Sequence, residues 1–232
     1  MSLKDELTNE VRNIFSTSWD VINGRVVPSP SDVGLGNKAV YLEKAVVLYA
    51  DLDGSTNMVD SKKWEYSAQV YKSFLHCAAK IIRSEGGDIT AYDGDRIMAI
   101  FINDGKADRA VRAALKIHWC LIELVNKIKL EKWNASDHVI KNIVGIDVSD
   151  LRAVRTGVRG DNDLVWVGRA ANYAAKLTSL SGSPTWITKE VHDLLSRSTL
   201  YGKNDAAMWQ AKTWTSMKNH NIFCSDFWWP VS

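Results

Sequence analysis

The chain has 232 residues, of which 46% are hydrophobic, and a formal net charge of +2. This length supports one sizeable core, and the balanced charge excludes the basic footprint of a nucleic-acid-binding protein. No apolar run approaches the ~18 residues of a membrane span, the first residues form no hydrophobic signal core, and the three cysteines are widely spaced. We therefore expect a cytoplasmic protein with free thiols, no nucleic-acid partner and no membrane span.

The first forty residues predict a helix and a connecting segment. Apolar residues recur at helical spacing from Leu3 to Ile22, which predicts an amphipathic helix that Asn23-Gly24 would end. Its apolar stripe must pack either on its own domain or on a partner chain, and the sequence leaves both open. The stretch 26–37, rich in Pro and Gly, then connects this helix to the rest of the chain.

Two predicted strands each carry a carboxylate at one end. The apolar run 45–50 stops on Asp51, and the predicted hairpin 88–102 contains an Asp-Gly turn followed by Asp95. Two carboxylates brought together from different strands repel each other unless a cation lies between them. The pattern therefore predicts a Mg²⁺ or Mn²⁺ site, and the backbone of the turn Gly54-Ser55-Thr56 could bind a phosphate. The alternative reading is that both acids are ordinary turn residues.

The order of elements indicates the fold. Helices over about 62–85 and 106–130 alternate with the strand 45–51, the hairpin and a strand over 143–148. The order β-α-β-β-α-β is the ferredoxin-like arrangement, in which the first and third strands lie side by side. This arrangement would place Asp51 beside the 93–95 turn.

The last third of the chain predicts further strands around 152–157 and 164–167 and an alanine-rich helix over 168–177. Asn172 and Lys176 are four residues apart, so they project from one face of that helix. After a strand at 184–187 and a short helix, the tail is aromatic, which is typical of a core or a subunit interface. The predicted fold class is α+β: a helix and linker at 1–40, a main domain at 41–195, and an aromatic-rich extension of that domain at 196–232.

Four stretches, 49–56, 94–101, 144–147 and 168–177, resemble in the same order the blocks of class III nucleotidyl cyclases. The resemblance covers roughly residues 40 to 190. It implies that Asp51 and Asp95 hold two divalent cations, Mg²⁺ or Mn²⁺, with the main-chain carbonyl of Leu52 as a further ligand. It also implies that the backbone from Asp53 to Thr56 wraps the triphosphate, while the ribose 3′-oxygen attacks the α-phosphorus and pyrophosphate leaves.

The resemblance assigns roles to the second group of residues as well. Asn172 matches the family's ribose-orienting Asn. Lys176 stands where an Arg is usual, so the resemblance implies that Lys176 keeps the catalytic role of that Arg but binds the phosphate with looser geometry. The two base-reading positions correspond to Ala91 and Val165, both apolar, which implies that purines are not selected in the usual way.

The residues beside the site favour a smaller base. Tyr49 shares a strand face with Asp51, and Trp166 and Arg96 are close in sequence to site residues. Such a narrowed pocket suits a pyrimidine better than a purine, and Arg96 can donate a hydrogen bond to a uracil carbonyl.

Together these residues are similar to the pyrimidine cyclases of bacterial Pycsar anti-phage systems. This similarity implies conversion of UTP to 3′,5′-cyclic UMP and pyrophosphate, or of CTP to cyclic CMP, with UTP favoured, and a product that acts on a separate effector. It also implies a head-to-tail homodimer that shares its sites. The alternatives are an adenylate or guanylate cyclase with altered base readers, and a catalytically silent binding or dimerisation module.

Overall fold

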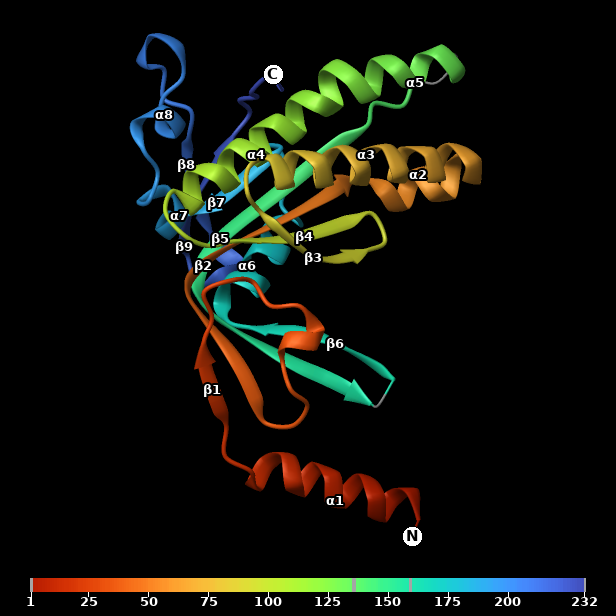
Figure 1. The fold of residues 1–232 in the computed structure, drawn as a ribbon. Coiled ribbons are helices and arrows are strands. Elements are labelled where there is room, and N and C mark those ends of the chain that lie inside the picture. Colours follow the sequence, from red (N-terminus) through yellow and green to blue (C-terminus); the bar gives the residue numbers. More distant parts are fainter. Residues whose placement is uncertain (1, 135–136, 159, 232) are drawn as a thin grey trace.

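One mixed sheet organises the molecule. The computed structural model describes residues 2–134, 137–158 and 160–231. Within these residues the strands lie in the order β3-β4-β2-β5-β7-β9-β8, and β1 and β6 extend the sheet beside β2 and β5 (Figure 1). The strands are β1 (Asp20–Asn23), β2 (Lys38–Asp53), β3 (Asp88–Asp93), β4 (Arg96–Phe101), β5 (Lys141–Val158), β6 (Asp161–Val167), β7 (Thr185–Thr188), β8 (Gln210–Trp214) and β9 (His220–Ser225).

Helices cover both faces of this sheet. The helices are α1 (Leu3–Ser16), α2 (Ser55–Ser61), α3 (Trp64–Ser84), α4 (Lys106–Cys120), α5 (Asn126–Lys132), α6 (Arg169–Leu177), α7 (Lys189–His192) and α8 (Arg197–Leu200). Alternate residues of β2 separate the two layers. Val46 and Leu48 pack in the core under α3 and α4, whereas Ala45 and Val47 pack in the core under α6.

The predicted ferredoxin-like order is confirmed. The segment β2-α3-β3-β4-α4-β5 forms the part of the sheet from the edge strand β3 to β5, with β2 antiparallel to both β4 and β5. The run 45–48 is fully buried because helices cover both of its faces, which explains why it is continuously apolar. The predicted hairpin is β3 and β4, and Gly94 takes a left-handed φ of 61° in its turn.

Two predicted boundaries near the N-terminus are wrong. The first helix ends at Ser16, and Asp20–Asn23 is a strand that pairs in parallel with β2. The apolar residues from Trp19 to Ile22 continue the helical spacing, but the backbone of this segment is paired in the sheet instead. The N–H of Asp20 donates to the carbonyl of Asn37, and the N–H of Gly24 donates to the carbonyl of Tyr41.

Later elements also differ from the prediction. The expected strands 143–148 and 152–157 are one strand, β5, because β2 pairs with residues from both of them and β6 continues the pairing to Val158. The expected helix 106–130 is divided into α4, a π-helical segment η2 (Leu121–Val125) and α5. The short helix α2 was predicted only as a turn. No helix among the described residues is long and apolar enough to cross a membrane.

Candidate functional site

Asp51 ends the buried part of β2 beside the start of β4. Its neighbour Ala50 pairs with Ile97, which brings the carboxylate next to the hairpin turn. Asp51 Oδ2 accepts hydrogen bonds from Arg96 Nε at 3.1 Å and Nη2 at 2.8 Å, and Oδ1 accepts one from the N–H of Leu52 at 3.0 Å. Burial raises the pKa of Asp51, and the negative charge of Asp95 adds to this rise, against the opposing effect of Arg96.

Asp95 lies in the turn on the other side of this site. Its Oδ2 is buried and has no hydrogen-bond partner among the described residues. A buried carboxylate oxygen without a partner is unfavourable, and a bound cation would satisfy it. Asp95 lies close enough to Asp51 for its charge to raise the pKa of that carboxyl, so the fold brings the two acids near each other.

The donor set fits a hard divalent cation. No group of three or more His, Cys, Asp and Glu side chains in the described part of the chain could hold a metal ion. Mg²⁺ is usually held by only one or two carboxylates together with substrate phosphates, so a pair of acids is the expected protein share of such a site. Asp51, Asp95 and the carbonyl of Leu52 would hold it here.

The predicted phosphate-binding turn opens a short helix. Gly54 takes a left-handed φ of 76° just before α2, a conformation that side chains other than glycine rarely adopt. Ser55 and Thr56 form the first turn, whose backbone N–H groups have no partner within the helix. This turn directly follows the strand that carries Asp51.

Tyr71 lies near the two acids, and the sequence did not reveal this position. It belongs to the apolar stripe of α3, and its hydroxyl lies close enough to Ser55 to interact with it. Burial raises the pKa of Tyr71, and the negative charges of Asp95 and Asp51 raise it further. No separate signal in the sequence marked it, because the apolar face of α3 also carries Tyr66 and Phe74.

Tyr49 and Arg96, which were predicted to contact the base, lie beside Asp51. Tyr49 is half-buried on the face of β2 that carries Asp51, and the guanidinium carbon of Arg96 lies 6.0 Å from the centre of its ring. Burial raises the pKa of Tyr49, so its hydroxyl is a hydrogen-bond donor at neutral pH. Ala91 is exposed on β3, opposite Met98 of β4.

Val165 and Trp166 do not join this group within one chain. Val165 pairs with Val154 of β5, whereas Asp51 pairs with Ile143, and these two partners are eleven residues apart along β5. A strand of that length extends up to about 36 Å. The side chain of Trp166 packs in the core under α6, while Val165 is exposed on the other side of β6.

Asn172 and Lys176 are held on a helix that packs closely on the sheet. A Cβ on Gly145 of β5 would collide with the carbonyl oxygen of Ala174 and lie 2.7 Å from the Cβ of Leu177. The buried face of α6 consists of Ala170, Ala174 and Leu177. Asn172 and Lys176 are exposed on the opposite face, so they point away from the sheet that carries Asp51.

A buried ion-pair network fixes the start of this helix. Arg169 donates two hydrogen bonds of 3.1 Å to the fully buried Asp147 and one of 2.6 Å to Glu190. Thr188 donates to Asp147 at 2.6 Å, and the ring of Tyr173 packs over the guanidinium of Arg169. This network was not predicted from the sequence, although an Asp inside an apolar strand is a signal that it has a buried partner.

Several known proteins are similar to this chain. No family model matches it. A uridylate cyclase from Burkholderia cepacia is 51% identical over 94% of both chains, and one from Xanthomonas perforans is 45% identical over the full length of both. A third, from Rhodovulum sp. (strain MB263), is 33% identical over 98% of both. The chain belongs to the uridylate cyclase family.

Solved structures agree on the fold of this cyclase. The adenylyl cyclase CyaB from P. aeruginosa is 21% identical, with a TM-score of 0.65 over 81% of this chain and 95% of that one. The guanylyl cyclase Cya2 is 19% identical, with a TM-score of 0.66 over 79% and 91%. The predicted resemblance to class III nucleotidyl cyclases is therefore confirmed. This member of the uridylate cyclase family is a nucleotidyl cyclase with Asp51 on β2 and Asp95 in the β3–β4 turn.

Proposed function

We propose that this cyclase converts UTP to 3′,5′-cyclic UMP and pyrophosphate at a site that binds two divalent cations. The observation that carries the proposal is that Asp51 on β2 and Asp95 in the β3–β4 turn lie close enough for their charges to interact, with one buried oxygen of Asp95 left without a partner in the described residues. The full-length relatives named uridylate cyclase support the choice of nucleotide.

The chain's own residues would act on the triphosphate as follows. Asp51, Asp95 and the Leu52 carbonyl hold Mg²⁺ or Mn²⁺, which when bound offsets the triphosphate charge and acidifies the ribose 3′-hydroxyl. The backbone N–H groups that follow Gly54 donate to phosphate oxygens. The attack of the 3′-oxygen on the α-phosphorus then forms one P–O bond and breaks the bond to the leaving pyrophosphate.

Two copies are needed to complete the site. Asn172 and Lys176 face away from the sheet that carries the acids, so one chain cannot apply both groups to one nucleotide. We propose a head-to-tail homodimer in which Asn172 of one copy orients the ribose bound by the other. Lys176, whose Nζ has only a weak 3.8 Å contact with Met217 Sδ in the described structure, would donate to the transferring phosphate.

The base would be recognised by hydrogen bonds from Arg96 and Tyr49 and by the shape of the pocket. Arg96 and Tyr49 lie beside Asp51 and can donate to the carbonyl oxygens of a pyrimidine. Ala91, Val165 and Trp166 would bound the pocket, the last two from the partner copy. The side chains of Ala91 and Val165 offer no hydrogen bond to a purine edge, so a purine would leave its polar groups unpaired.

In the cell, we propose that cyclic UMP is a second messenger made in the cytoplasm during phage infection and bound by a separate effector. The proposal rests on the similarity of the chain to Pycsar cyclases. Cells that carry this cyclase would accumulate cyclic UMP after infection, measured by mass spectrometry, and cells with the Asp51→Ala variant would not.

Incubation of the purified protein with each of UTP, CTP, ATP and GTP plus Mn²⁺ tests the reaction. We expect cyclic UMP as the main product, identified by mass. Faster turnover of CTP would make the chain a cytidylate cyclase, and faster turnover of ATP or GTP would show that the apolar readers do not exclude purines. Binding of triphosphates without any cyclic product would contradict catalysis.

A further inference from the structure

The helix α1 has an apolar side that its own chain does not cover. Its apolar side chains, which recur every three or four residues, include Leu7 and Val11, with 56% and 51% of their surface exposed, and Phe15 at 87%. No residue of α1 is buried. An isolated helix of fourteen residues is marginal in water, so this stripe requires a partner surface.

The position of α1 is fixed by its connection to the sheet. Asn37 Nδ2 donates to the carbonyls of Ile14 at 2.9 Å and Thr17 at 2.6 Å, and β1 then pairs in register with β2. Figure 1 shows α1 at the opposite end of the molecule from α3 and α5. Because only residues 17–19 separate α1 from β1, the helix cannot fold back onto those helices of its own chain.

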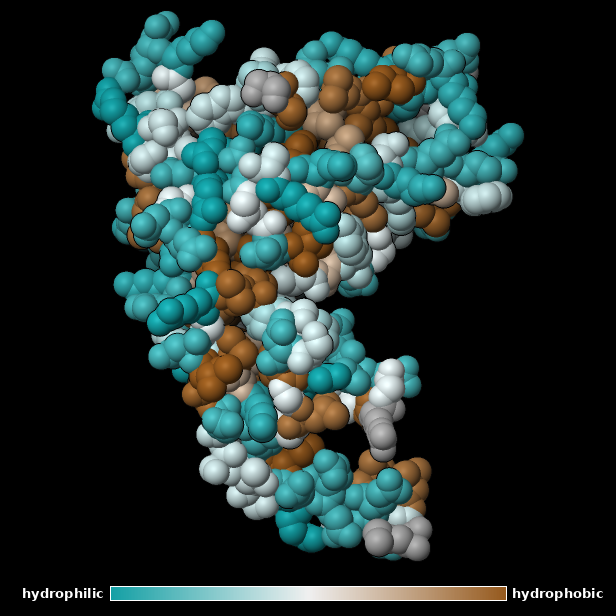
Figure 2. Space-filling view, in the orientation of Figure 1, coloured by the Kyte–Doolittle hydropathy of each residue, from teal (hydrophilic) through white to brown (hydrophobic). Residues whose placement is uncertain are grey.

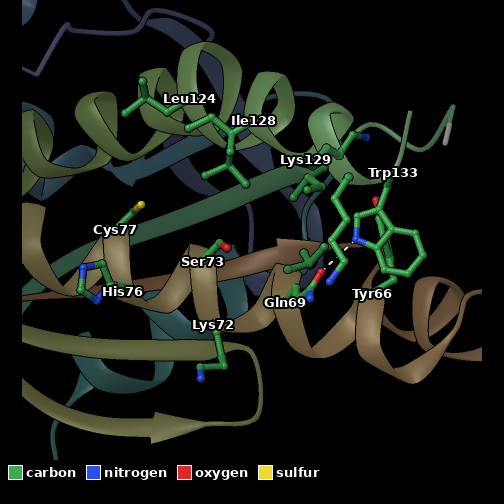
Figure 3. Close-up of a pocket in the computed structure, with 14 residues that line it drawn as sticks. Tyr66, Gln69, Lys72, Ser73, His76, Cys77, Leu124, Ile128, Lys129 and Trp133 are labelled. Carbon is green, nitrogen blue, oxygen red and sulfur yellow. Dashed lines mark hydrogen bonds between the residues drawn. The ribbon is translucent and has the colours of Figure 1, made fainter. Parts of the chain in front are cut away.

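A groove between α3 and α5 is also open. Its cavity of about 590 Å³ has mainly apolar walls, and Leu124 and Ile128 on one side are 39% and 56% exposed (Figure 3). One end is formed by Trp133, whose Nε1 donates to Gln69 Oε1 at 2.9 Å. Lysines stand on both sides of the groove: Lys72 on α3, and Lys129 and Lys132 on α5.

We propose that this groove binds helix α1 of a second copy of the chain, and that the exchange is reciprocal. The dimensions agree, since a fourteen-residue helix is about 21 Å long and the α3 wall from Tyr66 to Cys77 spans about 17 Å. The charges of the helix and of the groove are also complementary. Glu6 and Glu10 lie one helical turn apart along one edge of the α1 stripe.

These acids would face the lysines of α5. Lys129 and Lys132 are three residues apart, so they line one edge of the groove at a spacing similar to that of the two glutamates. The apolar stripe would then cover Leu124 and Ile128. This is the helix-in-groove mode of recognition, with apolar anchors in the groove and complementary charges at its rim.

The shape of the molecule places the two surfaces near each other in a dimer. Figure 2 shows a hollow between the helical body and the arm that carries β6 and α1. A two-fold mate whose helical body fills this hollow would bring its α3 and α5 toward α1. The inference rests on the proposed dimer, but it requires neither the proposed substrate nor catalysis.

Disulfide cross-linking tests the contact directly and without nucleotide. A Val11→Cys protein mixed with an Ile128→Cys protein should form a disulfide-linked dimer under mild oxidation, with the 11–128 linkage, or an 11–77 linkage to native Cys77, identified by mass spectrometry. The matched control is Arg12→Cys, one residue further along α1 and on its polar face, which should not cross-link to the groove. A dominant 11–11 linkage would show that α1 pairs with α1 and would overturn the proposal.

The dissociation constant of the dimer gives a second test. Leu7→Asn with Val11→Asn should raise it at least about 100-fold, because two apolar anchors are lost in each copy, whereas Arg12→Ala should leave it unchanged. Glu6→Lys with Glu10→Lys should also weaken the dimer, and adding Lys129→Glu with Lys132→Glu should restore it. An unchanged dissociation constant would contradict the proposal. Sedimentation of the protein with phosphatidylcholine–phosphatidylglycerol vesicles, if it is lost when α1 is changed, would contradict it as well.

The two hypotheses fail in different ways. If the groove does not bind α1, the 11–128 linkage is absent while cyclic UMP is still made from mixed active-site variants. If the proposed reaction is wrong, the linkage forms and no cyclic UMP appears.

Discussion

The folded chain provides hydrogen-bond partners for Asp51 but leaves one oxygen of Asp95 without a partner among the described residues. Asp51 is paired with Arg96 and with the N–H of Leu52, whereas one oxygen of Asp95 is buried with no partner in the described residues. The fold therefore holds Asp95 in a position that is unfavourable for stability. Residues kept in this way are typical of functional sites, where activity and stability make opposite demands.

Asp95→Ala should therefore lower the activity without lowering the stability of the fold. The cyclase activity should fall by at least about 1,000-fold, because a metal-binding carboxylate is lost. The free energy of unfolding should stay the same or rise by up to about 1 kcal/mol, because an unpaired buried oxygen is removed. Product formation and chemical denaturation measure the two effects. A variant that is destabilised by several kcal/mol would show that Asp95 is a structural turn residue.

At the scale of elements, the sequence predicted what local patterns encode. The run 45–51 and the Asp-Gly turn were sufficient to predict the second half of β2 and the β3–β4 hairpin, because burial and turn geometry leave a clear pattern, but the first half of β2, from Lys38, was not predicted. The break between β1 and α1 was missed, because apolar spacing is compatible with both structures. The position of Tyr71 near the acids and the network of Arg169 were missed because both depend on contacts between distant elements.

Gly145 shows how such a contact positions an element. Gly145→Ala should force α6 away from β5, because the new Cβ would collide with the carbonyl of Ala174. We expect a loss of about 1–3 kcal/mol in the free energy of unfolding. We also expect a marked loss of activity, because Asn172 and Lys176 move with α6. Gly34→Ala is the matched control, since its Cβ would meet only the flexible side chain of Lys38. Full activity in Gly145→Ala would argue against a catalytic role for this face of α6.

Glu85 joins α3 to α4 and should make stability depend on pH. Burial would raise its pKa, but hydrogen bonds and charges from Lys116 and Arg112 outweigh burial and hold the pKa below the ordinary value. Because the pKa is lower in the folded state, this stabilisation is present above about pH 4.3 and is lost as the pH falls through the folded value.

Glu85→Gln should therefore lower the free energy of unfolding at pH 7 by about 2 kcal/mol, with a smaller difference at pH 3. Denaturation curves at both pH values measure the effect. Glu123→Gln is a suitable control, because its ion pair with Lys127 is solvent-exposed and such pairs contribute little. An equal loss at both pH values would show that Glu85 acts through packing and not through its charge.

At the scale of the whole molecule, the two halves of the proposed site belong to different surfaces. The acids lie near the end of β2 and in the neighbouring β3–β4 turn, and the face of α6 that carries Asn172 and Lys176 points away from that sheet. In a two-fold dimer each nucleotide would contact the acids of one copy and the helix of the other, which gives two equivalent sites.

This arrangement predicts that two inactive variants restore activity together. Asp95→Ala and Asn172→Ala each damage both sites of their own homodimer. In a mixed dimer one site carries both changes and the other carries neither, so the second site is intact. With random exchange about half of the dimers are mixed, and each has one of its two sites intact, so activity should recover to about one quarter of the wild-type value.

The measurement is cyclic UMP formed after mixing, with subunit exchange verified by native mass spectrometry of differently tagged chains. A mixture of Asp51→Ala with Asp95→Ala is the control, because both changes fall in the same half of the site and every mixed dimer has a damaged acid pair at each site. Verified exchange without recovery would place both halves of the site within one chain.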